Sequence, residues 1–577
     1  MHFRVWAPEH RALSVVIEGG AEVELERDED GYFSRLVDAK AGARYRFKIG
    51  DQLFPDPASR FQPEGPHGPS QVIDPAFAWS EWHGVEPRCF YEMHIGTFTQ
   101  GGTFAVAAEK LPLLADIGIN VIEVMPVNEF AGTFGWGYDG VDLWAPSHLY
   151  GTPDDFRRFI DTAHQLGLAV ILDVVYNHFG PDGCYLRRFT PLYFTDRKNE
   201  WGDELNYEAQ GVREFFAENA AYWIDEFHLD GLRLDATQSI TDYSVIGEIV
   251  KRAHEAAGGR KILIAAENEP QDVALIDVEG VDALWNDDWH HAAMVAMTGR
   301  REAYYMDYRG TAQEFVSMAK HGFLYQGQFY AWQKKPRGMP SLHLHPRRFI
   351  SYLQNHDQIA NSARGERMQQ LTSPGRVRAM TALLLLQPQL PLLFQGQESG
   401  STKPFLYFAD HKPELAEAVA KGRREFLEQF PSLIGRELDA PHARETFEAC
   451  KLDWEERDES IIELHRTLLR LRIDDALIGG AVLSEDAFLL RWPQRLLIVN
   501  LGRDLHLEVL DEPLLAGEWT VLWSSESPVD IAHIPAESAA LFAATPLTPA
   551  PLPAARGEGD EGAGGDAAGR SDRDRST

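Results

Sequence analysis

The sequence predicts an α/β fold, a (β/α)8 barrel of the TIM class with an N-terminal β-sandwich and a small C-terminal β-domain. Period-2 apolar alternation fills the first ~85 residues. Eight short apolar runs, separated by amphipathic helical segments, follow from residue 89. Strand-like segments return after the last helix. Since eight strand-helix units close a barrel, the middle of the chain is expected to form one.

The N-terminal sandwich is predicted from alternating apolar residues at Phe3 and Val5, and then from Tyr45, Phe47 and Ile49. Turns bearing Gly and Asp separate these runs. A segment dense in Pro and Gly, 55–70, favours an ordered irregular connector. We place this domain at residues 1–86.

Eight strands are expected in the barrel, at 89–95, 120–127, 168–176, 230–236, 261–267, 282–287, 349–357 and 390–398. One of the intervening helices is defined by its caps. Thr152 is its expected N-cap, Pro153 its first residue, and Gly167 its stop. The barrel domain is placed at residues 87–475.

Two intervals are longer than a strand-helix unit requires. The segment 178–210 is rich in aromatic residues and is predicted to be an insertion after the third strand. The interval 288–348 also has spare length.

The C-terminal part is predicted to be a small β-domain over 476–547, because 488–492, 495–500 and 519–523 resemble strands. Residues 548–577 differ in kind. Their final segment has no apolar residue larger than Ala, so it cannot bury a core, and we predict a disordered tail.

Composition excludes several classes of function. The 577 residues carry a net charge of -33, which disfavours a nucleic-acid partner. No run of 18 apolar residues predicts a membrane span, and we expect a cytoplasmic protein. The three cysteines are too few and too scattered for a disulfide framework or a zinc site.

Acidic side chains stand at the carboxyl ends of four predicted strands: Asp173, Asp235, Glu267 and Asp357. Barrel active sites are built at that end, here called the barrel mouth. Because Asp235 and Glu267 are separated by about one strand-helix unit, they are expected on adjacent strands. A single such Asp is more often a cap or a loop hydrogen-bonder, but four together weaken that interpretation.

Paired carboxylates at a barrel mouth fit glycoside cleavage. One carboxylate must stay ionised while another holds a proton for the leaving oxygen. Arg233 is expected to favour the charged form of Asp235, and a more enclosed Glu267 is expected to have a raised pKa.

Other residues leave alternatives open. Trp136, Tyr138, Trp285 and Trp289 could stack on sugar rings, but for each Trp a place in the core is the commoner outcome. His94 fits either the site or a hydrogen-bonded core position. Asn177 with nearby carboxylates could bind Ca²⁺, but no run of alternating acidic ligands is present, and no metal site is predicted.

Four motifs resemble those of the α-amylase superfamily of glycoside hydrolases and transglycosylases: DVVYNH (173–178), GLRLDA (231–236), the Glu267 of IAAENE, and NHD (355–357). Within it, the sequence is most similar to the maltooligosyltrehalose trehalohydrolase family. Segments that carry this resemblance include FRVWAP (3–8), GWGYDGV (135–141), WGDELNY (201–207), WNDDWHH (285–291) and NHDQIAN (355–361). It covers about residues 1 to 530 and implies an immunoglobulin-like, glycan-associated N-terminal domain.

The resemblance implies a retaining hydrolase with three catalytic residues. Asp235 would be the nucleophile, Glu267 the general acid and then base, and Asp357 the group that holds hydroxyls of the distorted sugar. Arg233 would keep Asp235 ionised, and Asp173 would support Arg233.

It also implies substrate-binding roles. His178 and His356 would bond sugar hydroxyls, and Tyr138 would stack under the ring. Trp285 and Asp287 are also expected to bind substrate.

The implied substrate is maltooligosyltrehalose, cut at the α-1,4 bond next to its terminal trehalose to release trehalose. The implied functional partner is maltooligosyltrehalose synthase, and no cofactor is expected. Gln397 departs from the family pattern, where an acidic residue is expected, as does the continuation of AENEP (266–270).

Two rival functions remain. An α-1,4-glucan branching enzyme shares the sandwich, the barrel and the GWGY motif, but the NHDQ run and the long loop after the third strand favour the hydrolase. A catalytically silent glucan-binding protein would not require all three carboxylates.

Overall fold

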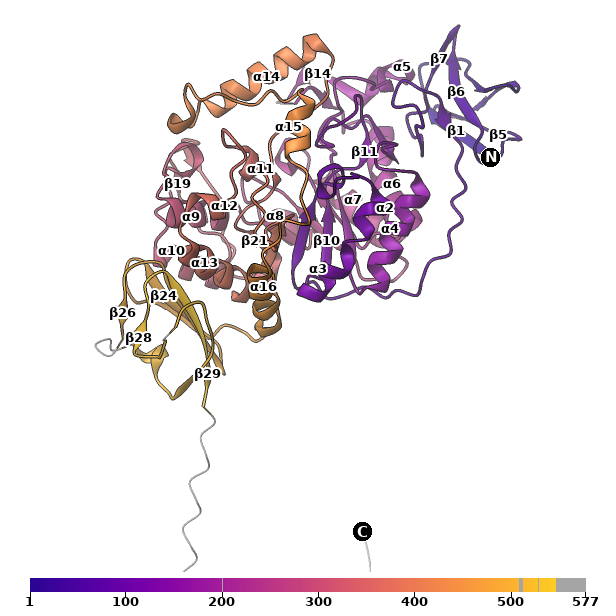
Figure 1. The fold of residues 1–577 in the computed structure, drawn as a ribbon. Helices are drawn as coiled ribbons and strands as arrows, with labels where there is room; N and C mark the ends of the chain where they lie inside the picture. The colour runs from indigo at the N-terminus through magenta and orange to yellow at the C-terminus, as the bar shows by residue number, and fades with distance from the viewer. Residues whose placement is uncertain (200, 508–511, 528, 546–577) are drawn as a thin grey trace, which may run out of the picture.

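A closed barrel of eight parallel strands forms the centre of the computed structural model, which describes residues 1–199, 201–507, 512–527 and 529–545 (Figure 1). The predicted tail at 548–577 lies outside these residues. The barrel strands, in chain order, are β9 (Phe90–Met93), β10 (Val121–Val124), β13 (Ala169–Val174), β16 (Gly231–Leu234), β17 (Leu263–Ala266), β18 (Ala283–Trp285), β21 (Phe349–Tyr352) and β22 (Leu390–Phe394). Strand β22 pairs with β9 and closes the cylinder. All eight predicted strands and the predicted fold class are confirmed.

The barrel strands are buried almost throughout, which explains their nearly continuous apolar sequences. Helices wrap them, among them α4 (Pro153–Gln165), α6 (Gln210–Glu226), α7 (Ser244–Ala256), α9 (Asp287–Thr298), α13 (Pro374–Leu386) and α16 (Glu459–Leu471). The cap predicted for α4 is present as a capping box, in which Thr152 and Asp155 satisfy each other's backbone amides.

Strand β16 approaches β17 closely at Gly231, whose φ is +156°. A Cβ there would lie 1.9 Å from the Leu263 carbonyl oxygen, so no side chain fits. The register continues to Arg233, which pairs with Ala265 of β17. The glycine therefore sets the spacing between the two strands that lead to Asp235 and Glu267.

The N-terminal strands form two sheets, as predicted for a sandwich. One contains β1 (His2–Trp6), β5 (Tyr32–Leu36) and β4 (Glu26–Arg27); the other is built on β2 (Ser14–Ile17) and β6 (Arg44–Ile49). Phe3, Val5, Val15 and Phe47 point between them and form a separate apolar core.

The segment after β13 forms α5 (Leu186–Phe189) and a hairpin of β14 (Phe194–Lys198) and β15 (Asp203–Leu205). Its Phe189 side chain is fully buried in the core of the sandwich and meets Phe47 edge to face at 6.0 Å. In Figure 1, α5 lies beside the N-terminal strands. The loop and the sandwich therefore share one core.

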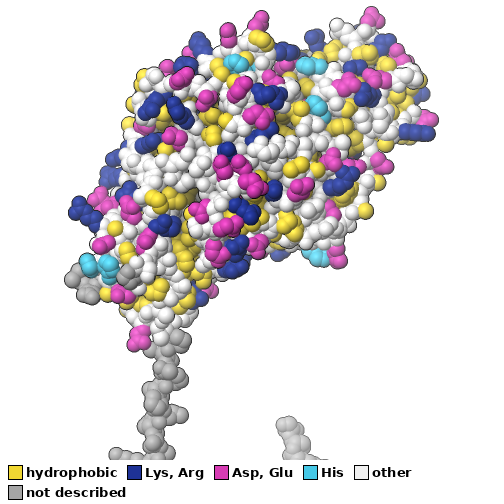
Figure 2. Space-filling model, in the orientation of Figure 1, with side chains coloured by type: hydrophobic (Ala, Val, Ile, Leu, Met, Phe, Trp, Pro, Cys, Tyr) yellow, Lys and Arg dark blue, Asp and Glu magenta, His cyan; other side chains and the backbone are white. Residues whose placement is uncertain are grey.

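The C-terminal strands form a five-stranded sheet in the order β23 (Gly479–Val482), β24 (Ala487–Arg491), β25 (Arg495–Asn500), β29 (Ser538–Ala544) and β27 (Trp519–Ser524). This sheet contacts α13 and α10 (Ala312–His321) on the outside of the barrel (Figure 1). On the face shown in Figure 2, Asp and Glu side chains are interspersed with Lys and Arg. None of the described helices is both long and apolar enough to cross a membrane.

Candidate active site

Arg233 joins the acidic residues at the barrel mouth. Its guanidinium is fully buried at the end of β16. One terminal nitrogen donates to both Asp173 oxygens at 2.9 Å and to Asp235 at 2.7 Å, and the other donates to Glu267 at 2.7 Å. Asp235 and Glu267 are therefore close neighbours, held by the two ends of one planar cation.

The carboxylates around Arg233 differ in how much of their surface is exposed at the barrel mouth. Asp173 is buried, whereas the side chains of Asp235, Glu267 and Asp357 keep 12%, 21% and 45% of their surface exposed. Asp173 thus lies beneath the site, and the other three open onto it.

The backbone after β16 contributes a hydrogen-bond donor to the site. Ala236 adopts a left-handed conformation with φ of 39°, an uncommon conformation for a residue with a Cβ. This turn directs its N–H to the Glu267 carboxylate at 3.1 Å. The oxygen of Glu267 that accepts this bond also accepts from Arg233, so its position is fixed from two sides.

The two expected catalytic carboxylates have different electrostatic surroundings. Burial, with the charges of Asp235, Asp357 and Asp287, raises the pKa of Glu267 to about 8, although Arg233 opposes the shift. Asp235 accepts hydrogen bonds from Arg233 and, at 2.9 Å, from the Asn177 amide. The mouth therefore places a carboxyl group that carries its proton at neutral pH beside one that accepts two hydrogen bonds.

Tyr138 and His356 form a stacked pair next to the carboxylates. Tyr138 lies in the loop between β11 (Asn128–Glu129) and β12 (Asp142–Pro146), and His356 begins α11 (His356–Ala360). Their rings are 5.2 Å apart at 23°. The Tyr138 hydroxyl contacts Asp173 at 2.6 Å and His356 Nε2 at 2.9 Å.

His178 stacks on Trp201, a ring of the inserted loop that is 42% exposed. Its Nε2 lies 2.9 Å from the Tyr138 carbonyl oxygen, and burial lowers its pKa. The neighbouring Asn177 donates through its amide nitrogen to Asp235 at 2.9 Å. Trp201 is an aromatic ring at the mouth, and no sequence pattern distinguished it from the other aromatic residues of the loop.

Trp285 is not placed as expected for a sugar-binding ring. It is 3% exposed, and its ring lies 4.3 Å below the Arg233 guanidinium, inside the barrel. Trp136 and Trp289 are likewise buried. The Trp285 ring therefore supports the arginine, and its contact with substrate stays a prediction.

Asp287 is the first residue of α9 and accepts a hydrogen bond from Tyr352. Burial raises its pKa to about 6, against the nearby Arg337. Arg337 is itself buried and pairs with Glu269 and Asp288. Arg337 was not predicted, since nothing in the long interval 288–348 singled it out.

His94 takes the core alternative. It is 1% exposed, and its ring nitrogens lie 3.0 Å from Thr97 Oγ1 and 3.0 Å from the Gly135 carbonyl oxygen. Burial lowers its pKa to about 3. It is therefore a neutral, hydrogen-bonded core residue.

Sequence reasoning missed two buried acids on the barrel strands below the mouth. Glu92 on β9 bonds His356, and Glu123 on β10 is its register partner. Both are fully buried. An acidic residue inside an otherwise apolar strand is the signal that could have identified them.

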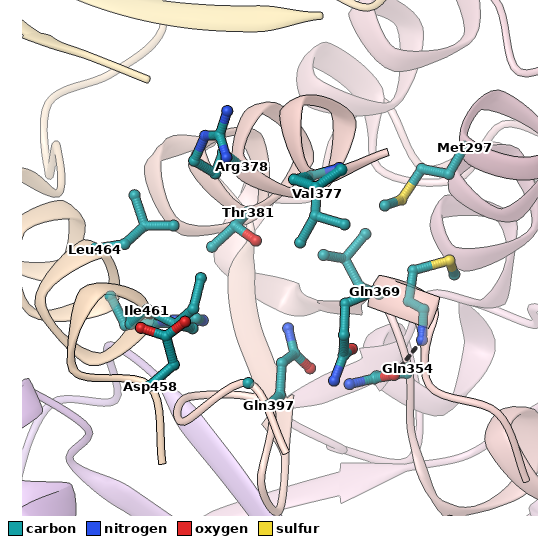
Figure 3. Close-up of a pocket in the computed structure, with 15 residues that line it drawn as sticks. Met297, Gln354, Gln369, Val377, Arg378, Thr381, Gln397, Asp458, Ile461 and Leu464 are labelled. Carbon is teal, nitrogen blue, oxygen red and sulfur yellow. Dashed lines mark hydrogen bonds between the residues drawn. The ribbon is translucent and has the colours of Figure 1, made fainter. Parts of the chain in front are cut away.

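A separate cavity of about 210 Å³ lies between α13, α16 and the segments after β21 and β22 (Figure 3). Leu353, Val377, Thr381, Gln397 and Leu464 are among the residues that line it. None of the predicted site residues faces it, so this cavity is distinct from the cluster around Arg233.

Comparisons with known proteins agree with the barrel fold. Residues 71–190 and 189–437 match the model of the alpha amylase catalytic domain, and 475–541 match a domain of unknown function, DUF3459. The chain is 41% identical to the Malto-oligosyltrehalose trehalohydrolase of Deinococcus radiodurans over 82% of this chain and 81% of that protein. It is 40% identical to the Malto-oligosyltrehalose trehalohydrolase of Saccharolobus solfataricus over 84% and 87%.

Two further matches bear on the alternatives. A Salmonella typhimurium protein described as an alpha amylase has a crystal structure that superposes on this one with a TM-score of 0.87. The two sequences are 36% identical, and the match covers 94% of this chain and 97% of that chain. A 1,4-alpha-glucan branching enzyme of Pseudoalteromonas atlantica matches at 32% identity but over only 42% of this chain and 39% of that protein.

Proposed function

Because the chain belongs to the malto-oligosyltrehalose trehalohydrolase family, whose catalytic domain is of the alpha-amylase type, we propose that it is a retaining glycoside hydrolase that releases trehalose from maltooligosyltrehalose. The bond cut is the α-1,4 bond next to the terminal α,α-trehalose. The observation that carries the proposal is the single Arg233 guanidinium that holds Asp235 and Glu267 side by side. Retaining enzymes need two carboxyl groups roughly 5 Å apart, closer than inverting ones.

In the first step, Asp235 attacks the anomeric carbon while Glu267 gives its proton to the glycosidic oxygen. The C–O bond to the trehalose unit breaks, and a covalent glucosyl ester forms on Asp235. The raised pKa of Glu267, about 8, supports this role because the group carries its proton at neutral pH. Trehalose then departs.

In the second step, Glu267 is a carboxylate and removes a proton from water. The water oxygen attacks the same anomeric carbon, and Asp235 leaves as the carboxylate. Two inversions give net retention. The hydrogen bond from the Ala236 amide to Glu267 supports this step, because it stabilises the charged form between the two steps.

The remaining mouth residues position the sugar. We assign Asp357, the most exposed of the three carboxylates, to the hydroxyls of the distorted ring. His356 and His178 bind sugar hydroxyls, Tyr138 lies beneath the ring, and Asp287 binds substrate further out. Asp173 supports Arg233 from below.

Two observations favour hydrolysis over the rivals. The branching-enzyme match covers less than half of either chain, whereas the trehalohydrolase matches cover more than four-fifths. Arg233 also holds both proposed catalytic carboxylates side by side, an arrangement that a protein that only binds glucan does not require.

The proposed substrate requires a second enzyme that makes a terminal trehalose on a maltooligosaccharide, and we propose maltooligosyltrehalose synthase as this functional partner. A cytoplasmic location stays a prediction. We also propose domain boundaries at residues 1–86, 87–475 and 476–547, with the 178–210 insertion in the second; the two sheets before β9 and the five-stranded sheet after α16 support them.

Product analysis tests the function. We expect trehalose and a shortened maltooligosaccharide from maltooligosyltrehalose, with little action on maltooligosaccharide or amylose. New α-1,6 branches in the amylose reaction would favour the branching enzyme, and no product from any of the three would favour the binding protein. NMR of the freshly released maltooligosaccharide should show the α-anomer at its new reducing end, as a retaining enzyme gives.

A further inference from the structure

Glu92 is a fully buried carboxylate on β9 that no step of the proposed reaction uses. It lies directly behind His356. One of its oxygens pairs with His356 Nδ1, and the other accepts the His356 backbone N–H at 3.2 Å. The carboxylate therefore binds both the ring and the backbone of the residue that precedes Asp357.

Hydrogen-bond accounting determines the other side of the His356 ring. Burial raises the pKa of Asp173 to about 6, so it is ionised at neutral pH and accepts from Arg233 through both oxygens. The Tyr138 hydroxyl therefore donates its single hydrogen to Asp173 at 2.6 Å. The Tyr138 oxygen can then only accept from His356 Nε2 at 2.9 Å. The Nε2 atom must carry a proton.

The Nδ1 atom shares a proton with the Glu92 carboxyl group, and the raised pKa of His356 places that proton on the ring at neutral pH. An imidazole with hydrogen on both nitrogens is a cation. Burial disfavours this charge, but Glu92 and Asp357 outweigh it and raise the pKa of His356 to about 9. The 2% exposed ring also stacks on Tyr138 and meets Trp136 at its edge.

We propose that Glu92 is a positioning residue of this active site: it holds His356 as an imidazolium, which in turn fixes the Tyr138 hydroxyl against Asp173. This role deepens the function proposed above and rests on it. The result is a continuous hydrogen-bond network from Glu92 through His356, Tyr138 and Asp173 to Arg233.

Charged and titratable groups face His356 from every element around it. They are Glu92 on β9, Glu123 on β10, Asp173 on β13, Arg233 on β16, Asp357 on α11, Tyr138 in the β11–β12 loop and His94 after β9. Arg233 opposes a second cation nearby, and His94 is neutral. Of the carboxylates, Glu92 alone contacts the ring within hydrogen-bond distance.

Glu123 provides a matched control. It is the register partner of Glu92 on the neighbouring strand and is equally buried. Neither of its carboxyl oxygens has a hydrogen-bond partner among the described residues, and burial raises its pKa well above the usual value. Because Glu123 is a neutral acid, replacing it with Gln removes no charge.

The experiment compares Glu92→Gln with Glu123→Gln in the full chain. The protein is labelled with ¹⁵N in histidine, His356 is assigned from the signal that His356→Asn removes, and its ring shifts are followed between pH 6 and 10. We expect His356 to be an imidazolium at pH 7 in the wild type and in Glu123→Gln. In Glu92→Gln its pKa should fall by about two units or more, since burial is then less opposed.

Kinetics supply the second readout. We expect Glu92→Gln to lower kcat/KM for trehalose release about 10- to 100-fold, and to move the alkaline limb of its pH profile down by about one unit or more. Glu123→Gln should leave the profile unchanged. Glu92→Asp, which retains the charge, should restore the imidazolium and part of the activity.

A neutral His356 at pH 7 in the wild type would overturn the proposal, and this result does not depend on whether Glu92→Gln folds. So would a Glu92→Gln protein that folds and keeps both the imidazolium and the wild-type pH profile. The NMR result is independent of substrate, so an imidazolium found in a protein that releases no trehalose would refute the proposed function and leave the charge assignment intact.

Discussion

At the scale of single residues, one arginine organises the site. Arg233 contacts three carboxylates and rests on the Trp285 ring, all within the barrel interior. Burying a cation is costly unless several anions compensate, and here the compensating anions are the residues proposed for catalysis. The arrangement thus links the stability of the barrel mouth to its chemistry.

Replacing either proposed catalytic group should abolish trehalose release. Asp235→Ala removes the nucleophile and Glu267→Gln removes the proton donor, so each should lower kcat/KM by several orders of magnitude. The assay is trehalose formation, with circular dichroism as the control for folding. Substantial activity in either folded variant would contradict the assigned roles.

The pH dependence should follow from Glu267. Its pKa is raised to about 8, so the protonated form that acts as acid is present below this pH and is lost above it. We expect kcat/KM to fall about tenfold per pH unit beyond the limb near pH 8. Fluoride needs little protonation to leave. With an α-glycosyl fluoride as substrate, the pH profile of the first step should therefore lack this alkaline limb. An alkaline limb with its midpoint below pH 6, measured with the natural substrate, would contradict the assignment.

At the scale of elements, helix caps contribute measurable stability away from the site. Thr152→Ala removes one half of the capping box of α4 and should cost about 1 kcal/mol. We expect roughly fivefold faster amide hydrogen exchange in the first turns of α4, with unchanged kcat/KM. Thr152→Ser keeps the hydroxyl and should exchange as the wild type does. Unchanged exchange in Thr152→Ala would show that the box adds no stability.

The sequence predicted the elements better than the inward-facing side chains. Parallel barrel strands are apolar on both faces, so their runs are easy to locate, and all eight were found. Whether Trp285 points to sugar or to Arg233 depends on register and barrel geometry, which local patterns do not encode. Glu92 and Arg337 were missed because their partners, His356 and Glu269, are distant in sequence and meet only when the barrel closes.

At the scale of the whole molecule, the acidic composition fits a neutral oligosaccharide substrate. The chain carries 88 Asp and Glu against 55 Lys and Arg. Since the substrate has no charge, the proposed binding depends on hydrogen bonds and ring contacts, and we expect KM to vary little with salt.

Deleting residues 554–577 should be harmless. Their composition lacks large apolar side chains, so the deletion removes nothing that can contribute to a core. We expect kcat/KM within about twofold of the full chain and a Tm unchanged within about 2 °C. Thermal unfolding and trehalose release measure both. A marked loss of either would show that the segment packs on the rest of the protein.

The shared core at Phe189 restricts how this protein can be recombined with its relatives. A chimera that exchanged only the N-terminal sheets would leave Phe189, from the segment after β13, without the hydrophobic core in which it packs. The junction would fail even though it falls between two apparently separate units. A working graft would have to carry residues 178–210 along with the sandwich, so the two segments are expected to be inherited together.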